Sequence, residues 1–386
     1  MQAVILAAGE GQRLGALTEA RPKPMLPVGN EPILESVVEA AVAAGVDEVI
    51  LVVGYGHERI QSHFGDGDEW GVPIRYVRQD HQLGAAHALA QVADETDGPF
   101  VLLHGDQLVD ASLIERLCGR FEETGRPAIA AVRSERPTEY GAITLDGEAV
   151  VAVSGAPTDD PPFLVNAGAY VLDERAFEAV EGLRSEEGSD LGMAAALQRL
   201  ADGGDLTAVL HRGAWQDLTY PWDLLATNAT LLREDARAVD GDGVHDSAVV
   251  AADVAVAPGV SVGPNATLST GVSLGRNVRV GSNVALSNCI VMQGAEVGDG
   301  AALEDCIVAE GATVGPNVTV EGGPATVEIG DTLHRSVGLG GVIGDWTRIG
   351  GGATLTPGTV VGREVRAESG TVLDGRIASD ETVRRG

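Results

Sequence analysis

A six-residue repeat of apolar residues in the last third of the chain narrows the choice of folds more than any other feature. The repeat holds one register over Val244, Val250, Val256, Val262, Leu268, Leu274, Val280, Leu286 and Met292. It then shifts twice by one residue, breaks between Glu321 and Gly341, and resumes at Ile343. Glycine, proline and asparagine stand between the apolar positions, as at the corners of a coil. This pattern predicts a parallel β-helix whose inward apolar residues stack coil on coil.

The chain before this repeat follows a different pattern. Short apolar runs such as residues 49–53 and 100–103 alternate with helix-like stretches, which is typical of βαβ units. We therefore expect an α/β domain over residues 1–228, with an open, mostly parallel, Rossmann-like sheet. Residues 229–243 are expected to form a linker helix and turn, and residues 244–386 the β-helix. Ligands of such sheets bind at the carboxyl ends of the strands.

Charge excludes one broad class of partner. The 386 residues include 57 Asp and Glu but only 26 Lys and Arg, a formal net charge of −31, so nucleic-acid binding is not expected. High Asp and Glu with a single lysine, Lys23, resembles the composition of salt-adapted proteins. The three cysteines, Cys118, Cys289 and Cys306, form no C-x-x-C pair, which favours reduced, buried thiols. No apolar run predicts a membrane span or a leader, so we expect a cytoplasmic protein with no membrane partner.

A glycine-rich loop follows the first predicted strand. It reads Ala8-Gly9-Glu10-Gly11-Gln12-Arg13, and Lys23 follows between two prolines. Glycines after a buried strand let backbone N–H groups surround an anion, and Arg13 and Lys23 add positive charge. Neither a Walker loop nor a dinucleotide fingerprint fits, because no Gly-Lys-Ser/Thr follows and position 14 is Leu. The loop is interpreted as a phosphate cradle, with a plain tight turn as the alternative.

The run Leu6-Ala7-Ala8-Gly9-x-Gly11-x-Arg13, with Arg21-Pro22-Lys23-Pro24 downstream, resembles the sugar-1-phosphate nucleotidyltransferase family, of the glucose-1-phosphate thymidylyltransferase and N-acetylglucosamine-1-phosphate uridylyltransferase kind. The resemblance implies an enzyme that uses Mg²⁺ to join UTP or dTTP to a sugar-1-phosphate, releasing pyrophosphate. Leu6, Ala8, Gly9 and Gly11 would bind the nucleotide. Arg13 and Lys23 would be catalytic, neutralising the triphosphate. Finding the chain's single lysine at this position strengthens the assignment.

Further segments match the family's base and metal sites. Gln79, with Gly84 five residues on, resembles the base region, where a glutamine amide pairs with a pyrimidine edge. Asp106 follows a buried strand and a glycine, and it matches the family's metal ligand. Asp217, in Trp215-Gln216-Asp217, would be the second ligand, since Mg²⁺ takes one or two carboxylates plus substrate phosphates. The alternatives are that Gln79 is an ordinary loop residue and that Asp106 and Asp217 are solvated acids at strand ends.

Gly141 and Asn166 lie in segments that resemble the family's sugar pocket. The alternatives are a hairpin turn at Gly141 and the start of a strand at Asn166. The family's Glu-Lys pair, which grips the sugar and its phosphate, is replaced here by Gly155-Ala156. A replacement grip would have to come from an arginine such as Arg133 or Arg212, or from bound metal. A non-catalytic nucleotide-binding regulatory subunit is therefore an alternative function.

The β-helix tail raises the question of a second activity. Family members with a left-handed β-helix include bifunctional enzymes whose tail transfers an acetyl group. Their His-Leu-Ser-Tyr motif is absent here, and His334 is a lone candidate base. We expect a structural tail that supports a homo-oligomer, commonly a trimer.

Overall fold

The computed structural model describes residues 1–134, 141–154, 163–184, 192–213, 215–234, 243–330 and 332–385. The chain divides into two compact units, one formed by Met1–Glu10 with Ile33–Asp217 and the other by Gly11–Pro32 with Leu218–Gly386. Among the described residues, no helix has both the length and the apolar character needed to cross a membrane.

The first unit is built on a mixed sheet with the strand order β5-β4-β1-β6-β11-β8-β12-β10-β9. Its strands are β1 (Gln2–Ala7), β4 (Glu48–Val53), β5 (Ile74–Arg78), β6 (Phe100–His104), β8 (Ala128–Ser134), β9 (Ala142–Asp146), β10 (Ala149–Ser154), β11 (Phe163–Leu172) and β12 (Thr207–Leu210). The first four in spatial order are parallel, as predicted. β11 is antiparallel to both neighbours, and β8 and β12 are again parallel. The α/β prediction is confirmed, with the antiparallel strands as its refinement.

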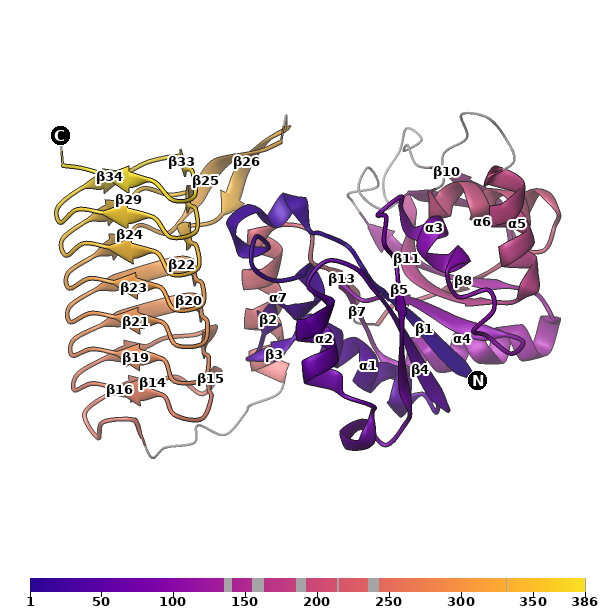
Figure 1. The fold of residues 1–386 in the computed structure, drawn as a ribbon, viewed down its shortest axis with the longest axis horizontal. Coiled ribbons are helices and arrows are strands. Elements are labelled where there is room, and N and C mark those ends of the chain that lie inside the picture. The colour runs from indigo at the N-terminus through magenta and orange to yellow at the C-terminus, as the bar shows by residue number, and fades with distance from the viewer. Residues whose placement is uncertain are drawn as a thin grey trace. The chain divides into compact units, whose positions relative to one another are not determined.

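Helices connect the strands (Figure 1). They are α1 (Ile33–Ala43), α2 (His57–Phe64), α3 (Ala85–Ala90), α4 (Ala111–Thr124), α5 (Glu174–Arg184) and α6 (Met193–Asp202), with a 3-10 turn, η3 (Asp68–Trp70). Local signals explain their limits. The Asp110 side chain caps α4 by accepting from the Leu113 N–H at 2.9 Å, and Gly125 ends it at φ 62°. Strands β1 and β4 are apolar and buried at nearly every position, as expected of parallel strands covered on both faces.

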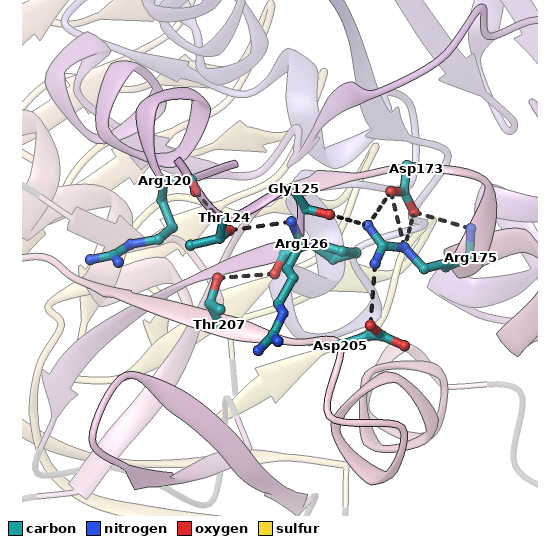
Figure 2. A network of polar contacts seen from close by, with 9 residues as sticks. Arg120, Thr124, Gly125, Arg126, Asp173, Arg175, Asp205 and Thr207 are labelled. Carbon is teal, nitrogen blue, oxygen red and sulfur yellow. Dashed lines mark hydrogen bonds and ion pairs between the residues drawn. The ribbon is translucent and has the colours of Figure 1, made fainter. Parts of the chain in front are cut away.

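A charged network joins the connections at the edge of the sheet where β8 and β12 begin (Figure 2). Arg175 donates to the Gly125 carbonyl at 2.7 Å and forms ion pairs with Asp173 at 2.6 Å and Asp205 at 3.2 Å. One guanidinium thus ties together the end of α4, the start of α5 and the turn before β12. This edge lies opposite the carboxyl ends of the parallel strands, so the network supports the fold and not the predicted site.

The second unit is a parallel β-helix with α7 (Pro221–Glu234) and the segment Gly11–Pro32. Its coils stack along the orange to yellow part of Figure 1. One ladder contains β14 (Val249–Val250), β17 (Thr267–Leu268), β20 (Ala285–Val291), β22 (Ala302–Val308), β24 (Thr319–Val320), β29 (Thr354–Leu355) and β32 (Val372–Leu373). A second contains β15 (Val254–Val256), β18 (Val272–Leu274), β20, β22, β27 (Gly341–Ile343), β30 (Thr359–Val361) and β33 (Arg376–Ile377). The third contains β16 (Ser261–Val262), β19 (Arg279–Val280), β21 (Glu296–Val297), β23 (Thr313–Val314), β28 (Arg348–Ile349), β31 (Arg366–Ala367) and β34 (Thr382–Val383).

The shifts in the hexapeptide register are shortened coils. Thr267 pairs with Ala285, 18 residues on, whereas Ala285 pairs with Ala302 and Ala302 with Thr319 at 17 residues. The long strands β20 and β22 turn without a loop from one face to the next, at Asn288 and Asp305, both with φ 50°. Each sequence shift therefore removes one corner residue and leaves the apolar stack intact.

The break in the repeat is an antiparallel hairpin, β25 (Pro324–Ile329) with β26 (Thr332–Gly338). The ladder continues across it, because Val320 pairs with Leu355. His334, the lone candidate base, packs its ring against Tyr220 and Trp222, with ring centroids 4.5 and 5.2 Å away.

Two of the cysteines stack inside the β-helix. Cys289 and Cys306 are both buried, free and in register on β20 and β22, and Cys118 is partly buried. Their wide separation in sequence corresponds to one coil.

Candidate active site

The end of β1 meets the end of β6 at the predicted phosphate loop. The Gly105 N–H donates to the Leu6 carbonyl at 2.9 Å, and a Cβ on Gly105 would lie only 3.0 Å from that oxygen. This close approach requires glycine before Asp106. Ala8 is buried behind the loop, whereas Gly9 is exposed, and a Cβ there would meet no described atom within 4 Å. Leu6 and Ala8 therefore support the loop, and Gly9 faces open space.

Gly11 and Lys23 lie in contact within the second unit. Gly11 has φ 68°, and a Cβ on it would lie 2.8 Å from Lys23 Cβ. Its carbonyl accepts from the Leu14 N–H at 2.9 Å and from Thr18 Oγ1 at 3.0 Å, which fixes the turn that begins the 3-10 segment η1 (Gln12–Leu17). Lys23 begins a short 3-10 turn, η2 (Lys23–Met25), and is 8% exposed. The two residues predicted to bind phosphate are therefore neighbours in space.

Arg13, the other predicted catalytic cation, is exposed and lines a cavity of about 490 Å³ in the second unit. Hairpin residues such as Val327 and late coil residues such as Ile377 form other walls of this cavity.

The segments that carry the two predicted metal ligands pair at the carboxyl end of β6. The short strands β7 (Gln107–Val109) and β13 (Trp215–Asp217) pair antiparallel, with Asp217 opposite Gln107. Asp106 immediately precedes Gln107, so the pairing brings the backbones of the two aspartates close together from distant parts of the sequence. The Trp215 indole N–H donates to the Ala167 carbonyl at 3.0 Å and holds β13 against β11.

This pair of carboxylates fits a Mg²⁺ ion. Both are hard oxygen donors at the sheet edge where ligands bind, and Mg²⁺ usually takes one or two carboxylates with substrate phosphates and water. Among the described residues, no three or more His, Cys, Asp or Glu side chains gather as a ready-made metal cluster. The protein would supply two ligands and the substrates the others.

Gln79 and Gly84 also lie together. Gln79 is 5% exposed, and its amide nitrogen lies 3.3 Å from the Gly84 carbonyl and 2.9 Å from His87 Nδ1. With both amide protons so engaged, the Gln79 oxygen is the group left to meet a base. The His87 ring therefore orients Gln79.

Gly141 and Asn166 are joined by the backbone, since the Asn166 N–H donates to the Gly141 carbonyl at 3.0 Å. Gly141 has φ 80°. The Asn166 side chain bonds Tyr170 Oη at 2.8 Å and the Gly168 N–H at 3.0 Å. It is therefore held rigidly at an irregularity of β11, with one amide proton left for a ligand.

Gly155-Ala156, where the family's Glu-Lys pair is missing, lies outside the described residues. The two arginines suggested as replacements line one cavity of about 270 Å³, together with Trp215. Arg133 stands near the carboxyl end of β8 and Arg212 just after β12, which runs parallel to it. Neither guanidinium has an ion-pair partner among the described residues.

A family model described as Nucleotidyl transferase matches residues 2–234, more than half of the chain. The chain belongs to the nucleotidyl transferase family. The family resemblance predicted from Leu6–Arg13 and Arg21–Pro24 is thereby confirmed. A second model, described as the GMPPB C-terminal domain, matches residues 250–383, the β-helix.

Three curated relatives illustrate the range of this nucleotidyl transferase family. The bifunctional protein GlmU of Methanococcus maripaludis is 33% identical over 244 residues, which cover 62% of this chain and 57% of that protein. The low-salt glycan biosynthesis nucleotidyltransferase Agl11 of Haloferax volcanii is 34% identical over 255 residues, covering 65% and 71%. The UTP–glucose-1-phosphate uridylyltransferase AglF of the same organism is 32% identical over 244 residues, covering 62% of this chain and 100% of its own length. The chain thus spans about 57% of the length of the GlmU relative.

Sequence reasoning did not give the structural roles of several residues that shape the site. They are Gly105, which lets β6 approach β1, Gly168, whose missing side chain makes room for Gln107, His87, which orients Gln79, and Arg21, which contacts the β-helix. Arg21 stood in the quoted motif, but its partners lie hundreds of residues away and carry no local signal.

Proposed function

We propose that this protein is a sugar-1-phosphate nucleotidyltransferase that makes an NDP-sugar and pyrophosphate from UTP or dTTP and a sugar-1-phosphate. The observation that supports the proposal is the β7–β13 pairing, in which Asp217 lies opposite Gln107, the residue after Asp106, at the sheet edge where β1 also ends. The named activities of AglF and Agl11 support the same reaction class.

The chemistry is an in-line displacement. An oxygen of the sugar phosphate forms a bond to the α-phosphorus, the bond from that phosphorus to the bridging oxygen breaks, and its electron pair leaves with pyrophosphate. Arg13 and Lys23 neutralise the triphosphate and the leaving group, and Gly9 and Gly11 let the backbone approach it. Asp106 and Asp217 would hold Mg²⁺, which when bound neutralises charge on the phosphates. No residue needs to form a covalent intermediate.

Recognition of the base rests on the Gln79 oxygen. An acceptor at this place pairs with a base that presents an N–H, as uracil and thymine do through their imide group, and repels the bare ring nitrogen of cytosine. Gly141 and Asn166 contact sugar hydroxyls, and Arg133 and Arg212 take over the grip on the sugar phosphate. The protein acts in the cytoplasm as a homo-oligomer, a trimer through the β-helix.

Pyrophosphate release tests the proposal. Purified protein is incubated in high-salt buffer with Mg²⁺ while UTP, dTTP, CTP, ATP and GTP are crossed with glucose-1-phosphate and N-acetylglucosamine-1-phosphate. We expect release that depends on the sugar phosphate, with UTP or dTTP, and its loss in Lys23→Ala. Nucleotide binding without release for any pair would instead identify a regulatory subunit. Free thiol from acetyl-CoA with glucosamine-1-phosphate would add the acetyltransferase activity that the missing motif argues against.

A matched pair of variants tests the replacement grip. Arg133→Gln with Arg212→Gln should raise KM for the sugar phosphate about 10-fold or more, with KM for the nucleotide unchanged. Unchanged KM for both substrates would exclude Arg133 and Arg212 from the grip on the sugar phosphate.

A further inference from the structure

The segment that carries Arg13 and Lys23 belongs to the same compact unit as the β-helix. Gly11–Pro32 groups with Leu218–Gly386, whereas Gly9 and Glu10 group with the sheet. Whatever holds this segment to the coils therefore determines where Lys23 stands. The contacts that do so lie inside one unit and can be described directly.

Arg21 makes the buried contact between the segment and a corner of the β-helix. Its side chain is 5% exposed and forms an ion pair with Asp345, which is 1% exposed. Its guanidinium also lies 3.4 Å from Glu310 Oε2 and 2.9 Å from Met292 Sδ. The Glu310 N–H donates to Asp345 Oδ1 at 2.9 Å. One guanidinium thus contacts three successive coils, two residues before Lys23.

The charge pattern of this corner selects the coils that Arg21 contacts. Repeated backbone hydrogen bonds stack the same corner position of successive coils, occupied by Arg276, Gln293, Glu310, Asp345 and Arg363. Acids stand at this position on two of the three coils that Arg21 contacts, and an arginine follows on the next coil. A cation placed one coil further along would be repelled, so the corner is specific for Arg21 at one height of the stack.

A neutral contact anchors the far end of the segment. The Gly29 N–H donates to Asn228 Oδ1 at 2.9 Å, and Asn228 Nδ2 donates to the Gly271 carbonyl at 3.0 Å. Asn228 is fully buried on α7. The segment is therefore fixed to the second unit on both sides of Lys23, by the Arg21 ion pair on one side and by this amide on the other.

We propose that the β-helix serves as the scaffold of the phosphate-binding segment, and that Asp345 is a positioning residue that acts through Arg21 on Lys23. This inference rests on the proposed function, in which Lys23 meets the triphosphate. It assigns the tail a role in nucleotidyl transfer itself, with no second active site required. A positioning role predicts effects on turnover and on nucleotide binding, and none on binding of the sugar phosphate.

The test is Asp345→Asn in the full-length protein, which removes the charge and keeps the shape. We expect kcat to fall by about 10- to 100-fold, because a small misplacement of a catalytic group is this costly. KM for the nucleotide should rise, KM for the sugar phosphate should stay unchanged, and hydrogen exchange in residues 11–32 should quicken. Asp299→Asn is the matched control, since Asp299 is an exposed corner aspartate that accepts from the Ser282 N–H at 2.7 Å and has no described contact with the segment.

Arg21→Lys and Arg21→Gln complete the series. Lysine keeps the ion pair and should retain more activity than glutamine, with KM for the sugar phosphate unchanged in both variants. Arg21→Gln changes no residue of the β-helix. It therefore tests the positioning role even if Asp345→Asn loosens the coils. Wild-type rates in Asp345→Asn and Arg21→Gln, or faster exchange without a change in kcat, would overturn the inference. An inactive wild type would refute the proposed function instead, and exchange in residues 11–32 would still test the anchor.

Discussion

Gly11 packs against Lys23 so closely that a Cβ on the glycine would lie 2.8 Å from Lys23 Cβ. Gly11→Ala should therefore displace the lysine as well as strain a backbone at φ 68°. We expect kcat/KM for the nucleotide to fall by about 100-fold, measured by pyrophosphate release.

Gly352→Ala is the control for this variant. Gly352 lies in the β-helix with φ 67°, and a Cβ there would meet no described atom within 4 Å. It should show the cost of backbone strain alone. Equal losses in the two variants would mean that contact with Lys23 is not what requires Gly11.

Removing either proposed metal ligand should raise the Mg²⁺ concentration that the enzyme requires. For Asp106→Asn and Asp217→Asn we expect kcat to fall by about 100-fold and the Mg²⁺ concentration at half-maximal rate to rise. Asp146→Asn, which changes an exposed acid at the end of β9, should behave as wild type. A wild-type Mg²⁺ titration in Asp217→Asn would exclude Asp217 from the metal site.

His87→Leu should weaken the choice of base. Without the ring nitrogen 2.9 Å from the Gln79 amide, the amide can rotate and present its N–H₂ group. We expect the ratio of kcat/KM for UTP to that for CTP to fall by about 10-fold, because the loss of one buried hydrogen bond typically has an effect of this size. His81→Leu alters an exposed neighbour and should leave the ratio unchanged. An unaltered ratio in His87→Leu would show that Gln79 is held by other contacts.

The β-helix should lose stability in alkali. Burial raises the pKa of Cys289 to about 12 and also raises the pKa of Cys306. Unfolded thiols ionise near pH 9.0, the ordinary value, so the free energy of unfolding should fall as pH rises from about 9 toward 12. Below pH 9 both states are protonated and this contribution is constant.

Thiol labelling measures this effect. At pH 8, Cys289 and Cys306 should label only when the β-helix unfolds, because the thiolate is the reactive form. Unfolding rates and equilibria followed in this way should depend less on pH in Cys289→Ala. Rapid labelling of either thiol in the native protein would contradict the buried stack.

Arg175→Ala should reduce stability without changing the chemistry. The side chain is 28% exposed and holds Asp173, Asp205 and the Gly125 carbonyl at once (Figure 2). Allowing for solvent screening, we expect a loss of about 1 to 2 kcal/mol in denaturant unfolding, with KM unchanged. Arg120→Ala breaks a pair with Glu148, which is 67% exposed, and should cost less than about 1 kcal/mol. A larger loss of stability in Arg120→Ala than in Arg175→Ala would mean that the network around Arg175 is not cooperative.

The sequence predicted most of the repeating part of the fold and most of its local features. The hexapeptide register located the β-helix, its shifts corresponded to the shortened coils at Asn288 and Asp305, and its break to the β25–β26 hairpin. The pattern succeeded because an inward position tolerates only apolar side chains, so apolar residues recur in the sequence at fixed intervals. The antiparallel placement of β11 was not predicted, since apolar runs carry no information on strand direction.

Pairings between distant residues were the part that sequence could not supply. Arg21 and Asp345 lie 324 positions apart, and nothing near Asp345 distinguishes it among 57 acids. The role of His87 depends on a ring nitrogen meeting an amide across a turn. Such contacts follow from the folded geometry, whereas the motif glycines are recognisable because few residues tolerate a positive φ.

The chain passes between the two units three times, before Gly11, after Pro32 and after Asp217. No single cut can therefore release two fragments that each contain one whole unit, and a fragment ending at residue 234 keeps Arg21 but not its partners. A gene fusion that exchanged one β-helix for another would have to bring a matching residue 21 or a matching corner. In this chain the ion pair links the identity of residue 21 to that of residue 345, so a substitution at one is expected to require a compensating substitution at the other.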